Sequence, residues 1–251
     1  METPRDQLVR FLRQAGIGSV FSREKNLNRV AIALARGKIG LLDERGFGRV
    51  VEEHGGVRLL RGRGEETADV KLVKGGRRVE FEIKLDQPKI IIDFGLWKYH
   101  SSLERKLLLK QVQQAVGVVR DTLWDGNLVF ARAPPEVLKL AEAMSFSGEV
   151  ISGMWEGEAV VLDPSADEEI KRFEENKSYI IGGIVERDRR MRTSELGYDL
   201  PRASLRLRGK ASLVPDRINL IVRIMCENLA GKPLEKAIEE NRGRREKLIQ
   251  R

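Results

Sequence analysis

Two glycines that directly follow an apolar run are the first residues whose types and spacing could do chemistry. Residues 179–181 are apolar, and Gly182 and Gly183 come next. Glycines at such a place let the backbone turn sharply and approach a ligand closely. Ligands of open parallel sheets bind at the carboxyl ends of strands, where these glycines would lie. The pattern is neither a G-x-G-x-x-G fingerprint nor a P-loop, so spacing alone slightly favours a plain tight turn over a binding loop.

A carboxylate and an amide occupy similar places elsewhere in the chain. Asp93 follows the β-branched run 90–92, so its side chain could serve a ligand or a proton, or could cap the following loop. Gln111 lies in a long helical pattern, on a face next to Leu107 and Leu108. A buried amide is costly unless it is hydrogen-bonded, so we expect Gln111 to have a partner.

Basic side chains dominate the segment after the glycine turn. Residues 187–210 include eight basic and three acidic side chains. Phosphate neutralisation by such side chains supplies most non-specific affinity for nucleic acid. A charge run is usually a solvated face, but this one adjoins the glycine turn, which favours a role in binding. Trp97, Tyr99 and His100 could stack a base, although core packing is the more common fate of a tryptophan.

The composition sets the class of protein that these residues serve. The chain has 251 residues, 46 Lys and Arg, 38 Asp and Glu, and a net charge of +8. A basic balance favours polyanionic partners, above all nucleic acid. One cysteine and two histidines argue against a metal site. No apolar run is long enough to span a bilayer, and the first residues lack the apolar centre of a signal peptide. We therefore expect a cytoplasmic protein with no metal and no membrane partner.

The elements that would position these residues fall into three regions. Residues 1–86 contain short apolar runs separated by glycines, which predicts a small β-rich or α+β domain, with a hairpin turn at Gly75 and Gly76. Residues 87–230 alternate strands and helices, which predicts a parallel sheet covered by helices. Residues 231–251 are expected to form a charged helix. Within 87–230 we expect strands at 89–93, 127–131, 158–162, 178–181 and 203–207, and helices at 102–120, 135–144, 166–175, 187–197 and 215–229.

In their order, these motifs resemble the SPOUT-superfamily RNA methyltransferases that modify N1 of the purine at position 9 of tRNA. The stretches 90–93 and 107–111 match the family's strand-aspartate and its helix with a glutamine. The stretch 179–185 matches its glycine turn, and 205–224 resembles its final loop and helix. The resemblance covers residues 88–230, and the ordered set is more specific than any single motif.

The resemblance implies a fold, a cofactor and a partner. The fold is an α/β sheet whose C-terminal part threads a trefoil knot, a rare exception to the ordinary rules of topology. The partner is tRNA, which a basic N-terminal domain would help to bind, and the enzyme would be a monomer. The cofactor is S-adenosylmethionine, with S-adenosylhomocysteine as product, held largely by backbone groups of three loops. By position in the family pattern, the cofactor-binding residues are Gly182, Gly183, Ile184, Val185, Leu205, Leu207, Ser212 and Val214.

One departure from the family pattern concerns the general base. The family usually has an aspartate after the glycine turn, whereas this chain has Glu186, with Asp188 two residues later. Guanine N1 carries a proton that must leave as the methyl arrives, so a base would help. Adenine N1 has a free lone pair, for which positioning could suffice. We therefore expect adenine to be favoured, with guanine 9 or dual specificity as the alternative.

The roles that follow can be stated residue by residue. Glu186 or Asp188 is the candidate acid–base group, and Asp93 and Gln111 would shape the pocket for the target base. Two rival functions remain. A non-catalytic RNA-binding protein on the same scaffold would not bind the methyl donor, and a nuclease would need a divalent metal. The expected phosphate contacts are Arg187, Arg189, Arg190, Arg206 and Arg208.

Overall fold

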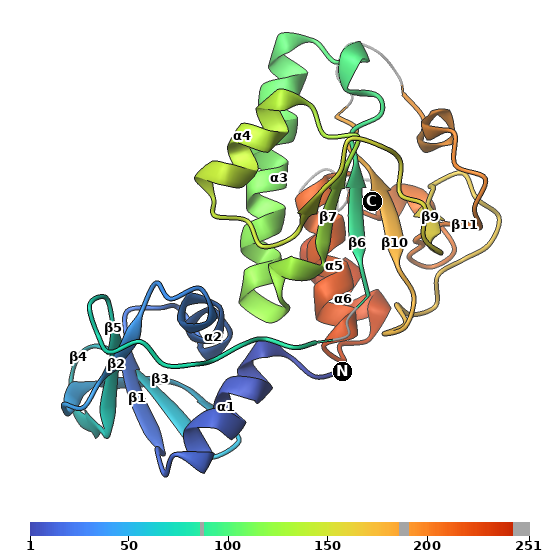
Figure 1. Cartoon of the computed structure of the whole chain (residues 1–251). Helices are drawn as coiled ribbons and strands as arrows, with labels where there is room; N and C mark the ends of the chain where they lie inside the picture. Colours follow the sequence, from blue (N-terminus) through green and yellow to red (C-terminus); the bar gives the residue numbers. More distant parts are fainter. Residues whose placement is uncertain (86–87, 186–190, 243–251) are drawn as a thin grey trace. The chain divides into compact units, whose positions relative to one another are not determined.

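The computed structural model describes residues 1–85, 88–185 and 191–242 of the chain. The chain divides into two compact units (Figure 1). The N-terminal unit consists of residues 2–86 together with 120–124, and the C-terminal unit contains the rest. In the described parts, no helix is both long enough and apolar enough to cross a membrane.

The N-terminal unit combines a five-stranded mixed sheet with two helices. The strand order is β2-β5-β1-β4-β3, in which β1 is parallel to both of its neighbours and the two outer pairs are antiparallel. Buried aliphatic side chains of both helices and of the sheet form its core. Its elements are α1 (Pro4–Gln14), β1 (Ser19–Ser22), α2 (Leu27–Ala35), β2 (Gly40–Leu42), β3 (Gly46–His54), β4 (Val57–Ala68) and β5 (Val70–Val73).

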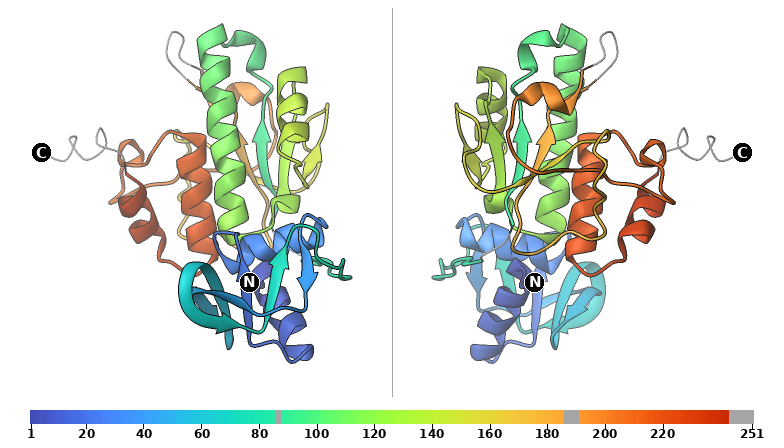
Figure 2. Two further views of the ribbon diagram at one scale, coloured as in Figure 1. Left: turned by 90° about the vertical axis from the view of Figure 1, so that its left-hand side faces the viewer. Right: turned by 90° about the vertical axis from the view of Figure 1, so that its right-hand side faces the viewer.

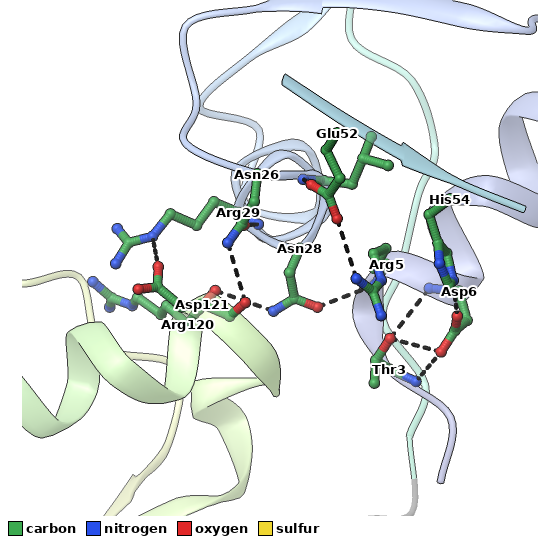
Figure 3. A network of polar contacts seen from close by, with 11 residues as sticks. Thr3, Arg5, Asp6, Asn26, Asn28, Arg29, Glu52, His54, Arg120 and Asp121 are labelled. Carbon is green, nitrogen blue, oxygen red and sulfur yellow. Dashed lines mark hydrogen bonds and ion pairs between the residues drawn. The ribbon is translucent and has the colours of Figure 1, made fainter. Parts of the chain in front are cut away.

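Both helices of this unit begin at residues that satisfy the free N–H groups of a first turn. Thr3 and Asp6 form a capping box at the start of α1, and the side chain of Asn26 accepts from the Arg29 N–H at the start of α2. Asn28, in the first turn of α2, donates to the Arg120 carbonyl at 3.1 Å (Figure 3). It also donates to the Leu123 carbonyl at 2.8 Å. These bonds explain why residues 120–124 belong to this unit.

The hairpin expected at Gly75 and Gly76 is wrong. Residues 78–85 form no strand, and β5 pairs with β1 and β2 instead. The turn carries the chain to β2, where Arg77 and Leu41 exchange backbone hydrogen bonds of 2.9 and 2.8 Å. A Cβ on Gly76 would lie 2.4 Å from the Gly40 carbonyl oxygen, so glycine is required for this close approach.

The C-terminal unit is built on a six-stranded sheet in the order β11-β9-β10-β6-β7-β8. All of its pairings are parallel, which confirms the predicted α/β sheet. Helices α3 and α5 cover one face of the sheet and α4 the other (Figure 2). The elements are β6 (Ile90–Asp93), η1 (Trp97–Tyr99), α3 (Ser102–Thr122), η2 (Asp125–Asn127), β7 (Leu128–Ala131), α4 (Pro135–Ala143), β8 (Glu149–Val150), β9 (Val160–Leu162), β10 (Tyr179–Gly182), η3 (Thr193–Leu196), β11 (Arg202–Ala203), η4 (Ala211–Leu213), α5 (Ile218–Leu229) and α6 (Leu234–Asn241).

The central strands β6, β7 and β10 hold the core of this unit. Every residue of β6 and β7 is buried, as is expected for strands covered on both faces. The register pairs Asp93 of β6 with Gly182 of β10 and with Ala131 of β7. The carboxyl ends of these parallel strands therefore meet at one edge of the sheet, which we call the carboxyl edge.

Four sequence predictions in this unit are wrong, partly right or only partly covered by the described residues. The helix expected at 166–175 is absent, because this segment bonds instead to a distant one: Ser204 donates to the Glu168 carbonyl at 2.8 Å and accepts from the Ile170 N–H at 2.9 Å. The strand expected at 203–207 shrinks to Arg202–Ala203. Only Thr193–Leu196 of the stretch 187–197 is helical among described residues, and residues 186–190 lie outside them. Of the C-terminal helix, α6 is described and residues 243–251 are not.

Candidate functional site

The glycine turn lies at the carboxyl edge, directly after β10. The Gly183 N–H donates to the Asp93 carbonyl at 2.7 Å. A Cβ on Gly183 would lie 2.8 Å from that carbonyl oxygen and 3.2 Å from the Phe94 ring. Only glycine fits there without moving the backbone. The residues 182–185 are thus placed where parallel sheets bind their ligands.

Asp93 is the fully buried anchor of the carboxyl edge. Its carboxylate lies 2.7 Å from Arg132 Nη2, accepts from Arg132 Nε at 2.9 and 3.1 Å, and accepts from the Tyr198 hydroxyl at 2.5 Å. It also accepts from the Gly95 N–H at 2.7 Å. This bond caps the loop after β6, which is one of the roles that the sequence analysis considered for Asp93. A buried charge requires such partners. With both oxygens engaged, the carboxylate holds other residues in place.

Arg132 and Tyr198 carry this network outward from Asp93. Arg132 Nη2 donates to the Leu196 carbonyl at 2.9 Å, and the Tyr198 hydroxyl accepts from the Trp155 N–H at 3.1 Å. Burial, and then the adjacent Asp93 carboxylate, raise the pKa of Tyr198, so its hydroxyl keeps the proton that it donates. The network ties the ends of β6 and β7 to the segment that follows the glycine turn.

Sequence reasoning missed Arg132 and Tyr198 as members of this site. A signal for Arg132 was present, because it follows strand β7 directly, at the same edge as Asp93. Its backbone has a φ of 50°, in the left-handed region that most side chains avoid. Tyr198 gave no such signal, since it lies in a loop far from Asp93 in the sequence.

His100 supports the glycine turn from the other side. Its Nε2 accepts from the Val185 N–H at 3.1 Å, so this nitrogen carries no proton in the bonded form. Burial lowers the pKa of His100 and keeps the ring neutral. Trp97 is also buried and packs on the rings of Phe94 and His100, which makes it a core residue. Of the three candidates for base stacking, Tyr99 alone is exposed.

Gln111 has the hydrogen-bond partner that its position requires. Its Oε1 accepts from the Ile218 N–H at 2.9 Å, at the first residue of α5. Helix α5 has no side-chain cap of its own, so a side chain from α3 fixes where it begins. Gln111 therefore positions the loop before α5, and it does not lie beside Asp93 in any described contact.

The predicted cofactor loops that follow β11 are compact. Leu205 and Leu207 are buried, and Leu207 exchanges backbone hydrogen bonds of 3.2 and 3.0 Å with Lys210. The turn between them places Arg208 and Gly209 in the left-handed region, at φ values of 52° and 74°. Ser212 is exposed and Val214 is half-buried. The loop after β11 begins at the same sheet edge as the glycine turn, because both strands are parallel to β9.

Of the five arginines predicted to contact phosphates, the structure describes two, Arg206 and Arg208. Arg206 donates to Ser204 Oγ at 2.9 Å and to the Ala166 carbonyl at 2.8 Å, so its guanidinium braces the protein itself. Arg208 is exposed and pairs with Glu239 at 2.8 Å. The acid–base candidates Glu186 and Asp188, and the arginines Arg187, Arg189 and Arg190, lie outside the described residues. Among described residues, no group of His, Cys, Asp and Glu side chains could hold a metal ion.

Comparisons with known proteins point to one family. No protein-family model matches the chain. A tRNA (adenine(9)-N1)-methyltransferase from Sulfolobus acidocaldarius is 33% identical over 244 residues, which cover 91% of this chain and 79% of that protein. A tRNA (guanine(9)-/adenine(9)-N1)-methyltransferase from Thermococcus kodakarensis is 30% identical over 62% of this chain and 47% of its own length. The crystal structure of Sulfolobus acidocaldarius Trm10 in complex with S-adenosylhomocysteine superposes with a TM-score of 0.76, covering 100% of this chain and 87% of that one at 28% identity.

Proposed function

Because this chain belongs to the Trm10 family of tRNA (adenine(9)-N1)-methyltransferases, we propose that it methylates N1 of the purine at position 9 of tRNA, with adenine favoured over guanine. The observation that carries the proposal is the 33% identity to the Sulfolobus acidocaldarius enzyme, spread over 91% of the chain. The alternative is activity on both purines, and the name of the Thermococcus kodakarensis relative favours it.

The methyl donor is S-adenosylmethionine, since a Trm10 structure of the same fold holds the product, S-adenosylhomocysteine. When bound, this group supplies an electrophilic methyl on a sulfonium. The carboxyl edge fits it chemically, because the turn 182–185 offers backbone groups and apolar side chains and carries no charge. We assign the binding residues to three segments of backbone, namely Gly182, Gly183, Ile184 and Val185; Leu205 and Leu207; and Ser212 and Val214.

We also propose that the chain between β10 and α5 is threaded as a trefoil knot. The mutual hydrogen bonds of 168–170 with Ser204, and the bond from Arg206 to the Ala166 carbonyl, support this proposal. These hydrogen bonds hold residues 166–170, in the loop after β9, against residues 204–206, in the segment after β11 that a knot would thread. A knot would hold the cofactor segments together without a local secondary structure of their own.

The chain's own residues would act by positioning and by moving one proton. Adenine N1 attacks with a free lone pair, so the enzyme has only to align the base with the methyl group. Guanine N1 must lose its proton as the bond forms, for which Glu186 or Asp188 is the candidate base. Asp93 and Gln111 shape the pocket indirectly, through the buried network with Arg132 and through the start of α5.

The tRNA would be bound by basic surfaces of the whole chain. We assign phosphate contacts to Arg187, Arg189, Arg190, Arg206 and Arg208. Arg208 first has to leave Glu239, and Arg206 would use the N–H groups that its bonds to Ser204 and Ala166 leave over. The N-terminal unit and the charged C-terminal segment would extend this surface. We propose that the chain works as a monomer, because one chain supplies every assigned group, and that it works in the cytoplasm on tRNA.

The deciding experiment uses the full chain, S-adenosylmethionine and tRNA transcripts that carry A or G at position 9. Mass spectrometry of the digested nucleosides should show N1-methyladenosine from the A9 transcript, formed faster than N1-methylguanosine from the G9 transcript. Activity on G9 alone would refute the adenine preference. The enzyme function would be refuted if the chain does not bind the methyl donor and does not modify either transcript. Calorimetry with S-adenosylmethionine measures binding of the methyl donor separately from methylation.

A further inference from the structure

The longest hairpin of the N-terminal unit contains two register shifts, one after Gly48 and a smaller one after Val50. Strands β3 and β4 pair as a ribbon at the edge of the sheet (Figure 2). Gly48 pairs with Glu66, but the next residue, Arg49, pairs with Arg61, so the four residues 62–65 are left out of the ladder as a bulge longer than the usual single residue. We call residues 46–50 and 60–68 the bulged ribbon.

Glycines fold the bulge back onto the ribbon. Gly62 has a φ of 70°, and a Cβ on Gly64 would lie 2.3 Å from the backbone of Gly48. The bulge is therefore a compact turn whose backbone is bare of side chains at two of its positions. Such a turn allows a close approach by a ligand, while Arg61 and Arg63 on either side of Gly62 stay exposed.

The bulged ribbon contains three arginines without a partner among the described residues, although Glu65 and Glu66 follow two of them on β4. Arg49 and Arg61 are directly opposite each other, which places both side chains on one face, and like charges in that position are destabilising. Within the described residues, neither of them forms an ion pair or a side-chain hydrogen bond, and the same holds for Arg63. By contrast, Arg58 of the same strand pairs with Glu66 at 3.1 Å.

The same face carries an exposed aromatic ring. Phe47 precedes Arg49 by two residues, so the two side chains point the same way from the strand. Its exposed fraction is 62%, well above that of Val51 on the same strand, at 41%. Gly46, on the opposite face, packs against the Phe21 side chain and turns the ring side of β3 outward. One ring amid arginines is too small an apolar patch for a protein interface core.

From these observations we propose that the bulged ribbon is an RNA-binding site, in which Phe47 stacks on an unpaired base of the tRNA and Arg49, Arg61 and Arg63 neutralise the adjoining phosphates. A single aromatic ring suffices for stacking on a base, and guanidinium groups supply the electrostatic part of binding. An anionic backbone between Arg49 and Arg61 would also relieve their repulsion. This inference rests on the proposed function, because it takes tRNA as the ligand.

The test measures the Kd of full-length variants for an unmodified tRNA transcript over a range of salt concentrations. Phe47→Leu keeps the apolar area and removes the ring, so binding should weaken about ten-fold, as for the loss of one stacked base, and Phe47→Trp should restore it. The double variant R61A/R63A should weaken binding and lower the salt slope by about 0.7–0.9 for each arginine. Matched controls are Val51→Ala on the same strand and Arg10→Ala, which removes an exposed arginine paired with Glu2.

The outcomes separate this inference from the function on which it rests. If the wild-type chain methylates tRNA and Phe47→Leu binds it within two-fold of wild type, the bulged ribbon proposal is overturned alone. If tRNA binding depends on Phe47 but no methylation occurs, the proposed function fails and the bulged ribbon stands. If the wild-type chain binds no tRNA, both fail. Equal thermal stability of the Phe47 variants is expected, because the ring is exposed.

Discussion

The carboxyl edge of the C-terminal sheet and the bulged ribbon of the N-terminal unit handle charge in opposite ways. At the edge, the Asp93 carboxylate is buried between Arg132 and Tyr198, and its hydrogen-bonding capacity is used within the protein. On the ribbon, Arg49 and Arg61 face each other in solvent without an acidic partner among the described residues. A charge paired within the fold fixes local geometry. A charge that the fold leaves unpaired remains available for a ligand, so one region suits alignment of reactants and the other suits capture of a polyanion.

The largest effect should come from breaking the paired region. In Asp93→Asn, the half-buried Arg132 guanidinium loses its fully buried counter-charge, and we expect the free energy of unfolding to fall by about 3 kcal/mol. Chemical denaturation followed by circular dichroism measures this loss. Tyr198→Phe removes two hydrogen bonds, the one that the hydroxyl donates to Asp93 and the one that it accepts from the Trp155 N–H, and should cost about 2 kcal/mol. A fully stable Asp93→Asn protein would show that the network does not hold the edge.

The next effect separates chemistry from binding. Glu186→Gln should lower turnover more than tRNA affinity, because the glutamine keeps the shape of the side chain and loses the base. On a G9 transcript we expect a decrease of about 100-fold in kcat, and on an A9 transcript much less. Single-turnover methylation and filter binding measure the two quantities. Asp188→Asn, treated in the same way, decides which carboxylate acts, and an equal loss of turnover and binding would argue against a chemical role.

A smaller effect should appear as pH falls. Since burial lowers the pKa of His100 below its ordinary value of 6.5, the unfolded chain binds the proton first. Stability from neutral His100 is thus complete above pH 6.5 and is lost as pH falls through the folded pKa, with a slope of up to about 1.4 kcal/mol per pH unit. Protonation also removes the acceptor for the Val185 N–H, so the Kd for S-adenosylmethionine should rise in the same range.

The control for this pH dependence is His100→Gln, measured by denaturation and calorimetry at pH 5 to 8. The variant should lose the part of the acidic decline that comes from protonation of His100. Glu104 opposes the shift of His100 and Arg105 adds to it, so neither needs to change in the experiment. If variant and wild type decline alike, the hydrogen bond to Val185 has no part in the pH response.

The smallest expected effect is a gain in stability, whereas the Asp93 variant is expected to lose stability. Arg49→Thr removes one of two like charges that face each other across the ribbon and introduces a residue that favours strands. We expect the chain to become more stable by about 0.5 kcal/mol while tRNA binding weakens. Thermal unfolding and the Kd for tRNA give the two values. Reduced stability together with weaker binding would mean that Arg49 serves the fold, and the contrast between the two regions would then be lost.

The sequence predicts the parts of this molecule whose signal is local. The run 90–92 predicts the buried strand β6, and helical spacing predicts α3 and α4 nearly to their ends. The segment 166–175 has a helical composition, but hydrogen bonds with Ser204 decide its structure, and no local pattern contains them. The hydrogen bonds of Asp93 with Arg132 and Tyr198 could not be predicted for the same reason. They are assembled by strand register and by a loop residue that lies about a hundred positions away.

The bond from Ile218 to Gln111 has a consequence for how the protein folds. Gln111, which caps the first N–H of α5, lies 107 positions earlier in the sequence. The first turn of α5 therefore depends on a contact of long sequence range, so we expect this helix to dock after α3 has formed.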